Sequence, residues 1–303
     1  MELSEWQRRA WRIVPARLRE PLHILIGGSM RWIDVSGPQL GASIAFYTMF
    51  ALAPLLVITI AIAGAVFGPD AARGQVVGEI QGLVGPVAAK AIEGMIETAW
   101  REPGGLKAAT IGVITLLIGA TGVFAELRRT LNLITNVTPT ASVISAFLRV
   151  RLTAFALVLG CGFLAIASLI LSAALAGVTQ FLSSRYAVLG VMATVLDLAI
   201  SVGVLSVAFA TLIRWLPDRP PSRRAVWISA IVSAVLFTIG KSLIGLYLGR
   251  ASVASSYGAA GSFVVIMLWV YYSSQILLFG AAIGYVSEER RKRKPAVAEP
   301  AST

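Results

Sequence analysis

The stretch GASIAFYTMFALAPLLVITIAIAGAVFG, residues 41–68, decides the fold class of this chain because it holds no charged side chain. A helix needs about 20 apolar residues to cross roughly 30 Å of hydrocarbon, and this stretch is longer. Five further apolar stretches follow it, and the first of these, span two, is the shortest. The chain is therefore predicted to be an all-α, polytopic membrane helix bundle with six transmembrane helices. The expected spans are residues 40–67, 108–125, 150–177, 188–213, 225–248 and 262–286.

The composition favours a membrane protein over a soluble one. Hydrophobic residues make up 57% of the chain and charged residues 14%, and the mean hydropathy is +0.80. A soluble domain has about 45–50% apolar and about 25% charged residues. Six helices that are apolar on every side would leave a soluble protein of this length almost no polar surface.

The basic residues predict the orientation. Most of the 26 lysines and arginines lie before the first span, between spans two and three, between spans four and five, and after span six. The positive-inside rule then places both termini in the cytoplasm, as an even number of spans requires. We interpret the net charge of +11 as topological, with arginines that meet the anionic headgroups of membrane lipids. Nucleic acid is not an expected partner.

The chain divides into three expected regions. Residues 1–36 form a cationic amphipathic segment that is interrupted by Pro15 and Pro21. Such a segment either lies in the membrane interface or packs under the bundle as a structural strap, and the sequence leaves both open. Residues 37–288 form the transmembrane domain.

The transmembrane domain includes one expected loop outside the membrane, and the third region follows the domain. Residues 68–107 are predicted to be an extracytoplasmic helical loop, because their apolar residues recur at helical spacing. A helical cap on the bundle is the simplest interpretation, and a lid or a dimer contact stays open. Residues 289–303 are predicted to be a basic, disordered cytoplasmic tail.

The residues that most enzymes need are scarce. The chain has one histidine, His23, and one cysteine, Cys161. It has no His, Cys and carboxylate cluster at metal-binding spacing, no phosphate-binding loop and no dinucleotide fingerprint. We therefore expect no enzymatic activity, no metal and no cofactor.

Two ionisable residues fall inside the expected spans. Asp197 lies in span four and Lys241 in span five, at similar depths on consecutive antiparallel helices. Charges inside the membrane are costly and usually face a partner or a wet cavity. Thr194 and Ser201 share a helix face with Asp197, and Thr238 shares one with Lys241. We predict that the two charges form a buried pair or line an aqueous vestibule, and a static structural pair stays an equal alternative.

Span six adds polar groups near its midpoint, namely Tyr271, Tyr272, Ser274 and Gln275. Polar groups at the membrane midplane are typical of transporter sites, although they also serve as hydrogen bonds between helices. Small residues at GxxxG spacing favour close helix packing. These glycine pairs are Gly64/Gly68, Gly245/Gly249 and Gly280/Gly284.

Four motifs in order make the chain similar to the YihY/virulence factor BrkB family of bacterial inner-membrane proteins. They are GASIAFYTMFALAPLL from Gly41, FAELRRTLNLIT from Phe124, RWLPDRPPSRRAVWISAIVSAVLFTIGKSLIGLYL from Arg214 and SSYGAAGSFVVIMLWVYYSSQILLFGA from Ser255. Thr238 and Ala282 stand where many family members carry a carboxylate. The motif positions that this resemblance marks are Phe46, Tyr47, Pro54, Asn132, Gly240, Tyr257, Gly258 and Gly261.

The resemblance implies a function in the bacterial plasma (inner) membrane. It points to a transporter or a translocase of lipids or lipid-linked molecules that supports envelope integrity, with a lipid or small molecule as substrate. The alternative is a membrane scaffold without transport, and a homo-oligomer stays open. The family's legacy label, ribonuclease BN, does not fit the residues. Metal-dependent RNA hydrolysis needs clustered carboxylates or histidines, and the cytoplasmic acids are scattered along the sequence.

Overall fold

The structure is a computed structural model, and it describes residues 15–67, 90, 93, 105–138, 187–250 and 261–293. Within these ranges all regular secondary structure is helical, which confirms the predicted all-α class. The described helices are α2 (Ala16–Asp34), α3 (Gly37–Phe67), α6 (Gly105–Ile134), α8 (Ala187–Trp215), α9 (Arg223–Arg250) and α11 (Gly261–Arg293).

Three of the described helices contain a segment that is long and apolar enough to cross a membrane. These segments are Leu198–Trp215 in α8, Arg223–Ile244 in α9 and Phe263–Arg293 in α11. They overlap the expected spans four, five and six, with ends that differ by up to ten residues. Helices α3 and α6 lie at the expected spans one and two. Span three, nearly all of the loop at 68–107 and the first 14 residues lie outside the described residues.

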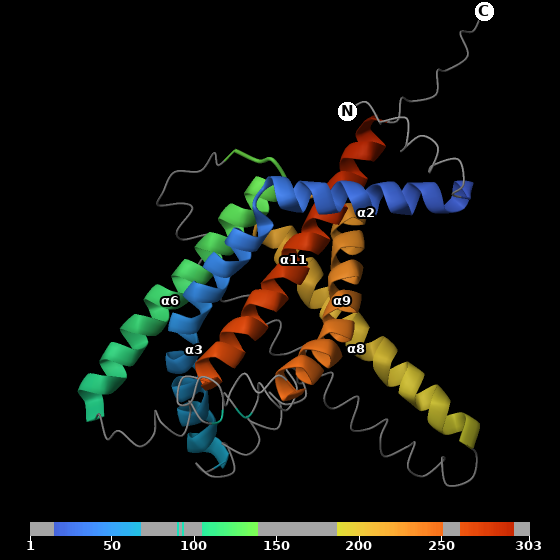
Figure 1. Cartoon of the computed structure of the whole chain (residues 1–303). Helices are drawn as coiled ribbons and strands as arrows, with labels where there is room; N and C mark the ends of the chain where they lie inside the picture. The colour runs from blue at the N-terminus through green and yellow to red at the C-terminus, as the bar shows by residue number, and fades with distance from the viewer. Residues whose placement is uncertain are drawn as a thin grey trace, which may run out of the picture.

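Helix α11 occupies the centre of the described bundle and contacts α2, α3, α6 and α9. Helix α3 packs on α6, and α8 packs on α9. In Figure 1, α2 crosses one end of the bundle, while the α3–α6 pair and α8 spread apart towards the opposite end. The end at which α2 lies is called the α2 end below.

The apolar core lies at the α2 end. Leu131 and Ile134 of α6 and Leu278 of α11 have no exposed surface, and Leu216 at the end of α8 is 4% exposed. These residues meet because α3 and α9 begin at this end, whereas α6 and α8 finish there. The other buried members of the core are Leu40, Ile44, Leu127, Ile213, Val226, Leu277, Ala281 and Ala282.

Away from the core, large apolar side chains point outward from α8 and α9. Leu198 on α8 and Ile231, Ile239 and Leu243 on α9 are all exposed. Outward-facing apolar residues of this size are unusual on a soluble monomer, where large exposed apolar patches mark an interaction surface. On these candidate spans they are suited to contact with lipid chains.

Close packing of α9 on α11 depends on the glycine pair Gly280/Gly284. A Cβ added at Gly280 would lie 2.8 Å from the carbonyl oxygen of Ser229, and one added at Gly284 would lie 2.7 Å from that of Ala225. Both distances are shorter than real Cβ contacts, so only glycine fits without movement of the backbone. The GxxxG prediction is confirmed for this pair.

The expected interruption at Pro21 does not occur. Pro15 caps the start of α2, and Pro21 lies inside the helix. A proline here removes one backbone hydrogen bond close to the beginning of the helix. That loss is tolerated because α2 is held from outside, where Gly28 brings it close to the backbone of Ile283 on α11.

Helix α11 continues past the expected end of span six, so residues 289–293 are helical and do not belong to a disordered tail. Two ion pairs at four-residue spacing, Glu288–Lys292 and Glu289–Arg293, support this extension. Basic side chains in a last helical turn also interact favourably with the helix dipole. Residues 294–303 lie outside the described part of the chain.

Candidate functional site

The predicted intramembrane residues lie on α8, α9 and α11. Asp197 and Thr194 are part of α8, but their side chains lie outside the described residues, and Ser201 is half-buried on the same helix. Lys241 is half-buried on α9. The pairing of Asp197 with Lys241 therefore stays a prediction.

The hydroxyl of Tyr272 lies against the backbone of α9 at Gly240, next in sequence to Lys241. The Tyr272 ring is 6.5 Å from the ring of Trp269, which contacts Phe237 of α9 at 5.8 Å. Phe237 in turn contacts Phe209 of α8 at 6.0 Å. A row of aromatic rings thus joins α8, α9 and α11 and ends at Gly240, the residue before Lys241. It brings the predicted residue Tyr272 to the motif position Gly240.

Other predicted polar residues are engaged within their own helices. The Thr238 hydroxyl donates to the carbonyl oxygen of Ala234 at 2.8 Å, and the buried Ser274 hydroxyl donates to that of Val270 at 2.8 Å. Both bonds satisfy the hydroxyl locally, as is common for serine and threonine in apolar helices. Tyr271 is half-buried on α11.

Gln275 lies on the side of α11 that faces α2 and α3, whereas Tyr272 faces α9. Its amide oxygen accepts a hydrogen bond from Trp32 Nε1 at 3.1 Å, and its amide nitrogen donates to the Pro38 carbonyl at 3.4 Å. Gly41 of α3 lies close to the same amide group. Gln275 therefore joins three helices and is not brought to Lys241.

The motif positions are distributed over several elements. Phe46 and Tyr47 are exposed on α3, with their rings in an edge-to-face contact at 5.9 Å. Asn132 is buried near the end of α6. Pro54 lies within α3 and Gly261 begins α11. Tyr257 and Gly258 lie outside the described residues.

A network of charged and polar side chains at the α2 end was not predicted from the sequence. At its centre, Asp218 in the turn between α8 and α9 receives Arg128 of α6, through Nε at 3.0 Å and also through Nη2. Asn132 donates to the second carboxylate oxygen at 2.7 Å and accepts from the Asp218 backbone N–H at 3.0 Å. The side chains of Arg128 and Asp218 are only 12% and 5% exposed.

Glu126, one helical turn before Arg129, forms a second part of this network. Its carboxylate accepts a hydrogen bond from Ser43 of α3 at 2.6 Å and an ion pair from Arg129 at 3.0 Å. Glu126 is 8% exposed. A buried carboxylate is stable only when it is hydrogen-bonded or paired, and here α3 and α6 are joined by the groups that satisfy it.

Arg31 of α2 caps the end of α6. Its Nε donates to the carbonyl oxygen of Ile134 at 3.0 Å, and its Nη2 donates to that of Leu133 at 2.7 Å. The last carbonyls of a helix have no partners inside it, and a cation there also interacts favourably with the dipole. The Arg31 guanidinium lies 5.1 Å from the ring centroid of Tyr285 on α11, so one side chain connects three helices.

These contacts correct one interpretation of the sequence. Arg31 and Arg128 are internal cross-links at the α2 end, so their role is not limited to topology and lipid headgroups. Glu126 and Asp218, which are far apart in the sequence, belong to the same end of the fold. Among the described residues, however, no three His, Cys, Asp or Glu side chains are grouped so that they could hold a metal ion.

Thr130 lies on α6, between Glu126 and Asn132 in the sequence, and its hydroxyl is buried without a hydrogen-bond partner in the described part of the chain. A buried, unsatisfied hydroxyl costs about 1–3 kcal/mol, whereas an apolar group of the same shape avoids that cost. We expect Thr130→Val to keep or raise the midpoint of thermal unfolding in detergent. The matched control is Thr135→Val, because Thr135 donates to the Leu131 carbonyl at 2.8 Å. The control should lower the midpoint, and a larger drop for Thr130→Val would contradict this assignment.

Comparison with known sequences finds relatives over most of the chain. The chain matches the sequence profile of the family described as "Virulence factor BrkB" over residues 30–302. It is 27% identical to a UPF0761 membrane protein of Alteromonas mediterranea over 240 residues, which cover 78% of each chain. It is 30% identical to a UPF0761 membrane protein of Chromobacterium violaceum over 270 residues, which cover 85% of this chain and 61% of the relative.

Several relatives are longer than this chain. The match to a UPF0761 membrane protein of Acinetobacter baylyi, at 24% identity, covers 80% of this chain but 57% of the relative. The chain thus spans a little over half the length of that protein. No solved structure matches the chain.

Proposed function

Because the chain belongs to the virulence factor BrkB family of membrane proteins, we propose that it is a transporter or translocase of lipids or lipid-linked molecules in the bacterial inner membrane. The family and the membrane association come from the sequence matches and the candidate spans. Transport, the inner membrane and the class of substrate are the proposed part.

The observation that carries the proposal is Lys241. This ionisable residue lies inside the candidate span Arg223–Ile244 of α9, where a charge is costly and usually has a functional partner or pathway. Tyr272 of α11 brings a phenolic hydroxyl to the same part of α9. A lysine and a hydroxyl group on neighbouring helices in this part of the membrane are suited to attract and pass an anionic headgroup.

The proposed orientation places the α2 end in the cytoplasm. The last turn of α11 carries Arg290, Arg291, Lys292 and Arg293, and α9 begins with Arg223. The positive-inside rule favours the cytoplasm for such clusters. The network of Arg128, Asp218 and Asn132 would then join α6 to the turn between α8 and α9 at the cytoplasmic end.

The test is a lipid translocation assay with the full chain in liposomes that carry a fluorescent phospholipid. Lys241→Met should lower the initial rate of transfer between leaflets about tenfold or more, because it removes the membrane-embedded charge. Lys292→Met is the matched control, since Lys292 has a side chain that is 73% exposed beyond the apolar part of α11. Its rate should equal that of the wild type.

The second candidate function is a membrane scaffold without transport. It is favoured by the cross-links at the α2 end, which join α2, α3, α6 and α11 into a fixed unit. A folded wild-type protein that moves neither phospholipids nor lipid-linked sugars would overturn the transport proposal and leave the scaffold.

We further propose that the chain has no enzymatic activity. RNA cleavage that copurifies with the wild type and is lost in a folded Glu126→Gln or Asp218→Asn variant would contradict that view.

A further inference from the structure

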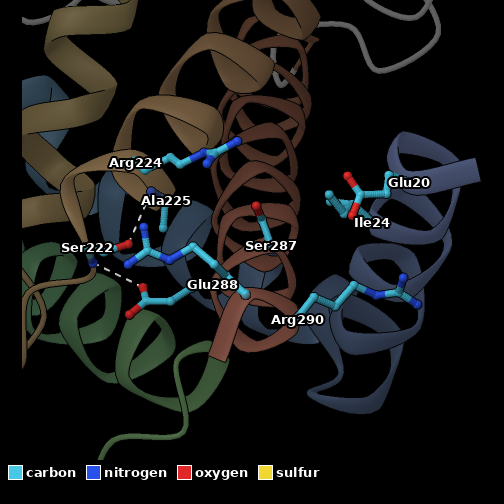
Figure 2. A pocket seen from close by; sticks show the side chains of 9 residues that line it. Glu20, Ile24, Ser222, Arg224, Ala225, Ser287, Glu288 and Arg290 are labelled. Carbon is cyan, nitrogen blue, oxygen red and sulfur yellow. Dashed lines mark hydrogen bonds between the residues drawn. The ribbon is translucent and has the colours of Figure 1, made fainter. Parts of the chain in front are cut away.

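We propose that a cavity at the α2 end binds the phosphate group of an anionic phospholipid. The cavity has a volume of about 110 Å³ and lies between α2, the start of α9 and the end of α11 (Figure 2). A single water needs roughly 10–15 Å³ of such space, so a group of several atoms fits. The lining residues are Glu20, Ile24, Ser222, Arg224, Ala225, Ser287, Glu288, Arg290 and Arg291.

Three arginines supply the charge for a phosphate. Arg224 comes from α9, and Arg290 and Arg291 come from the last turns of α11. All three are exposed, and within the described residues no ion pair or hydrogen bond engages their guanidinium groups. Guanidinium groups bind phosphate oxygens through paired, charge-assisted hydrogen bonds. The beginning of α9 adds the favourable end of a helix dipole.

The two carboxylates in the wall are engaged elsewhere. Glu288 accepts a hydrogen bond from the Ser222 backbone N–H at 3.0 Å and an ion pair from Lys292 at 2.9 Å, so each of its oxygens has a partner. Glu20, across the cavity on α2, also has an interaction of its own. The three arginines of the wall outnumber its two glutamates, and Lys292 offsets the charge of Glu288.

His23 of α2 reports the positive potential near this cavity. Burial lowers its pKa below the usual value of 6.5, and the nearby charge of Arg290 lowers it further. A bound phosphate would offset the second effect, because it would neutralise part of the arginine charge.

The apolar surroundings favour a phospholipid over a soluble phosphate. Ile24 and Ala225 form an apolar part of the wall. The face of α2 opposite to α11 exposes large apolar side chains at helical spacing. They are Leu22, Leu25, Ile26, Met30 and Ile33. In Figure 1 this helix crosses α9 and α11, which contain candidate membrane spans. These apolar side chains suit α2 to the lipid interface, so the cavity beside it would lie at the depth of phospholipid headgroups.

This site goes beyond the proposed function, because it lies at the α2 end, away from Lys241 on the later part of α9. It would anchor α2 to the leaflet at this end and would exist whether the chain transports lipids or not. Failure to find the site would leave the translocation assay unaffected, and a negative translocation assay would leave the site unaffected.

The experiment is native mass spectrometry of the full chain released from nanodiscs that contain equal amounts of phosphatidylglycerol and phosphatidylcholine. The wild type should retain one phosphatidylglycerol. The triple variant Arg224→Gln, Arg290→Gln, Arg291→Gln should lose it, with affinity lower by about 100-fold or more, because each charge-assisted hydrogen bond to the phosphate contributes about tenfold. The matched control is Arg219→Gln, Arg223→Gln, Arg293→Gln, which removes the same charge from outside the cavity. It should retain the lipid.

A second variant, Ile24→Trp, fills the cavity without changing the charge and should also prevent retention. Equal loss in the matched control would show a diffuse surface effect and overturn the proposal. Displacement of the lipid by millimolar inorganic phosphate, or retention of phosphate without lipid, would assign the cavity to a soluble anion and overturn the lipid assignment. Equal retention of phosphatidylcholine would do the same for the requirement of an anionic lipid.

Discussion

Replacing Gly284 or Gly280 by leucine is expected to remove nearly all folded protein from the membrane. Each added side chain would begin at a Cβ that is 2.7 Å from the carbonyl oxygen of Ala225 or 2.8 Å from that of Ser229. Backbone atoms cannot move aside as the end of a flexible side chain can. The added side chain would therefore force α9 away from α11. This contact joins two candidate spans, and overpacking in a well-packed interior typically costs about 1–3 kcal/mol for much smaller changes.

The measurement is the yield of monodisperse protein in size-exclusion chromatography after mild detergent extraction. Gly203→Leu on α8 is the matched control, because in the described part of the chain no atom of another helix lies within 4 Å of a Cβ added at Gly203. The control should give the wild-type yield. If Gly284→Leu and Gly280→Leu also gave the wild-type yield and melting midpoint, the described packing of α9 on α11 would be wrong.

Replacing Asp218 by leucine is expected to destabilise the α2 end by about 3 kcal/mol. The change leaves the guanidinium of Arg128 buried without the carboxylate it faces, and removal of one member of a buried ion pair costs about 3–5 kcal/mol. It also removes the acceptor for the amide of Asn132. Unfolding of the purified protein, followed by a thiol-reactive dye at Cys161 or by circular dichroism, measures the effect.

The double variant Arg128→Met, Asp218→Leu separates the cost of leaving Arg128 without its carboxylate from the cost of losing the Asp218 side chain itself. It should recover most of the loss, because two apolar groups replace a pair whose burial is itself costly. Arg293→Ala is the surface control, since its pair with Glu289 is 3.6 Å long and Arg293 is 78% exposed, and it should change stability by less than about 0.5 kcal/mol. A double variant less stable than Asp218→Leu alone would contradict a coupled pair.

The course of the helices was largely predictable from the sequence, because apolar length is a strong signal for a membrane helix. The residues at which the helices end were less predictable. Helix α6 continues to Ile134, beyond the expected end of span two, through Glu126, Arg128 and Arg129. A prediction from hydropathy alone ends the helix at such charged residues. In the fold they remain helical because Ser43 and Asp218 satisfy the charges of Glu126 and Arg128.

The network at the α2 end could not be derived from spacing along the chain. Arg128 and Asp218 are separated by 90 positions, and Asn132 and Asp218 by 86, so only the folded bundle brings them together. One signal was present, because Asn132 and Arg128 lie in the motif FAELRRTLNLIT and Asp218 lies in RWLPDRPP. Two motifs rich in polar groups, each at the end of an apolar helix, indicate a shared contact. A count of basic residues between the spans does not reveal this network, because such a count treats every arginine as exposed.

For the predicted intramembrane site, the sequence indicates the depth of each residue but not the direction of each side chain. Lys241 was identified because a charge in an apolar stretch is conspicuous, and Tyr272 does approach the same part of α9. Gln275 was grouped with them by its depth, yet it serves the junction of α2 and α3. Depth along a helix follows from the sequence, whereas the direction of a side chain depends on which neighbours the helix acquires.

The most direct test of the transport proposal is the loss of fluorescence when an external reductant is added to liposomes that contain the wild-type chain and a head-labelled phospholipid. The proposal predicts that labelled lipid in the inner leaflet also becomes reduced, since the protein exchanges lipid between leaflets. Reduction that stops at the outer leaflet, as in vesicles without protein, in preparations where the protein is folded and correctly inserted, would contradict phospholipid translocation. The same result with a labelled lipid-linked sugar would contradict the transport function as a whole.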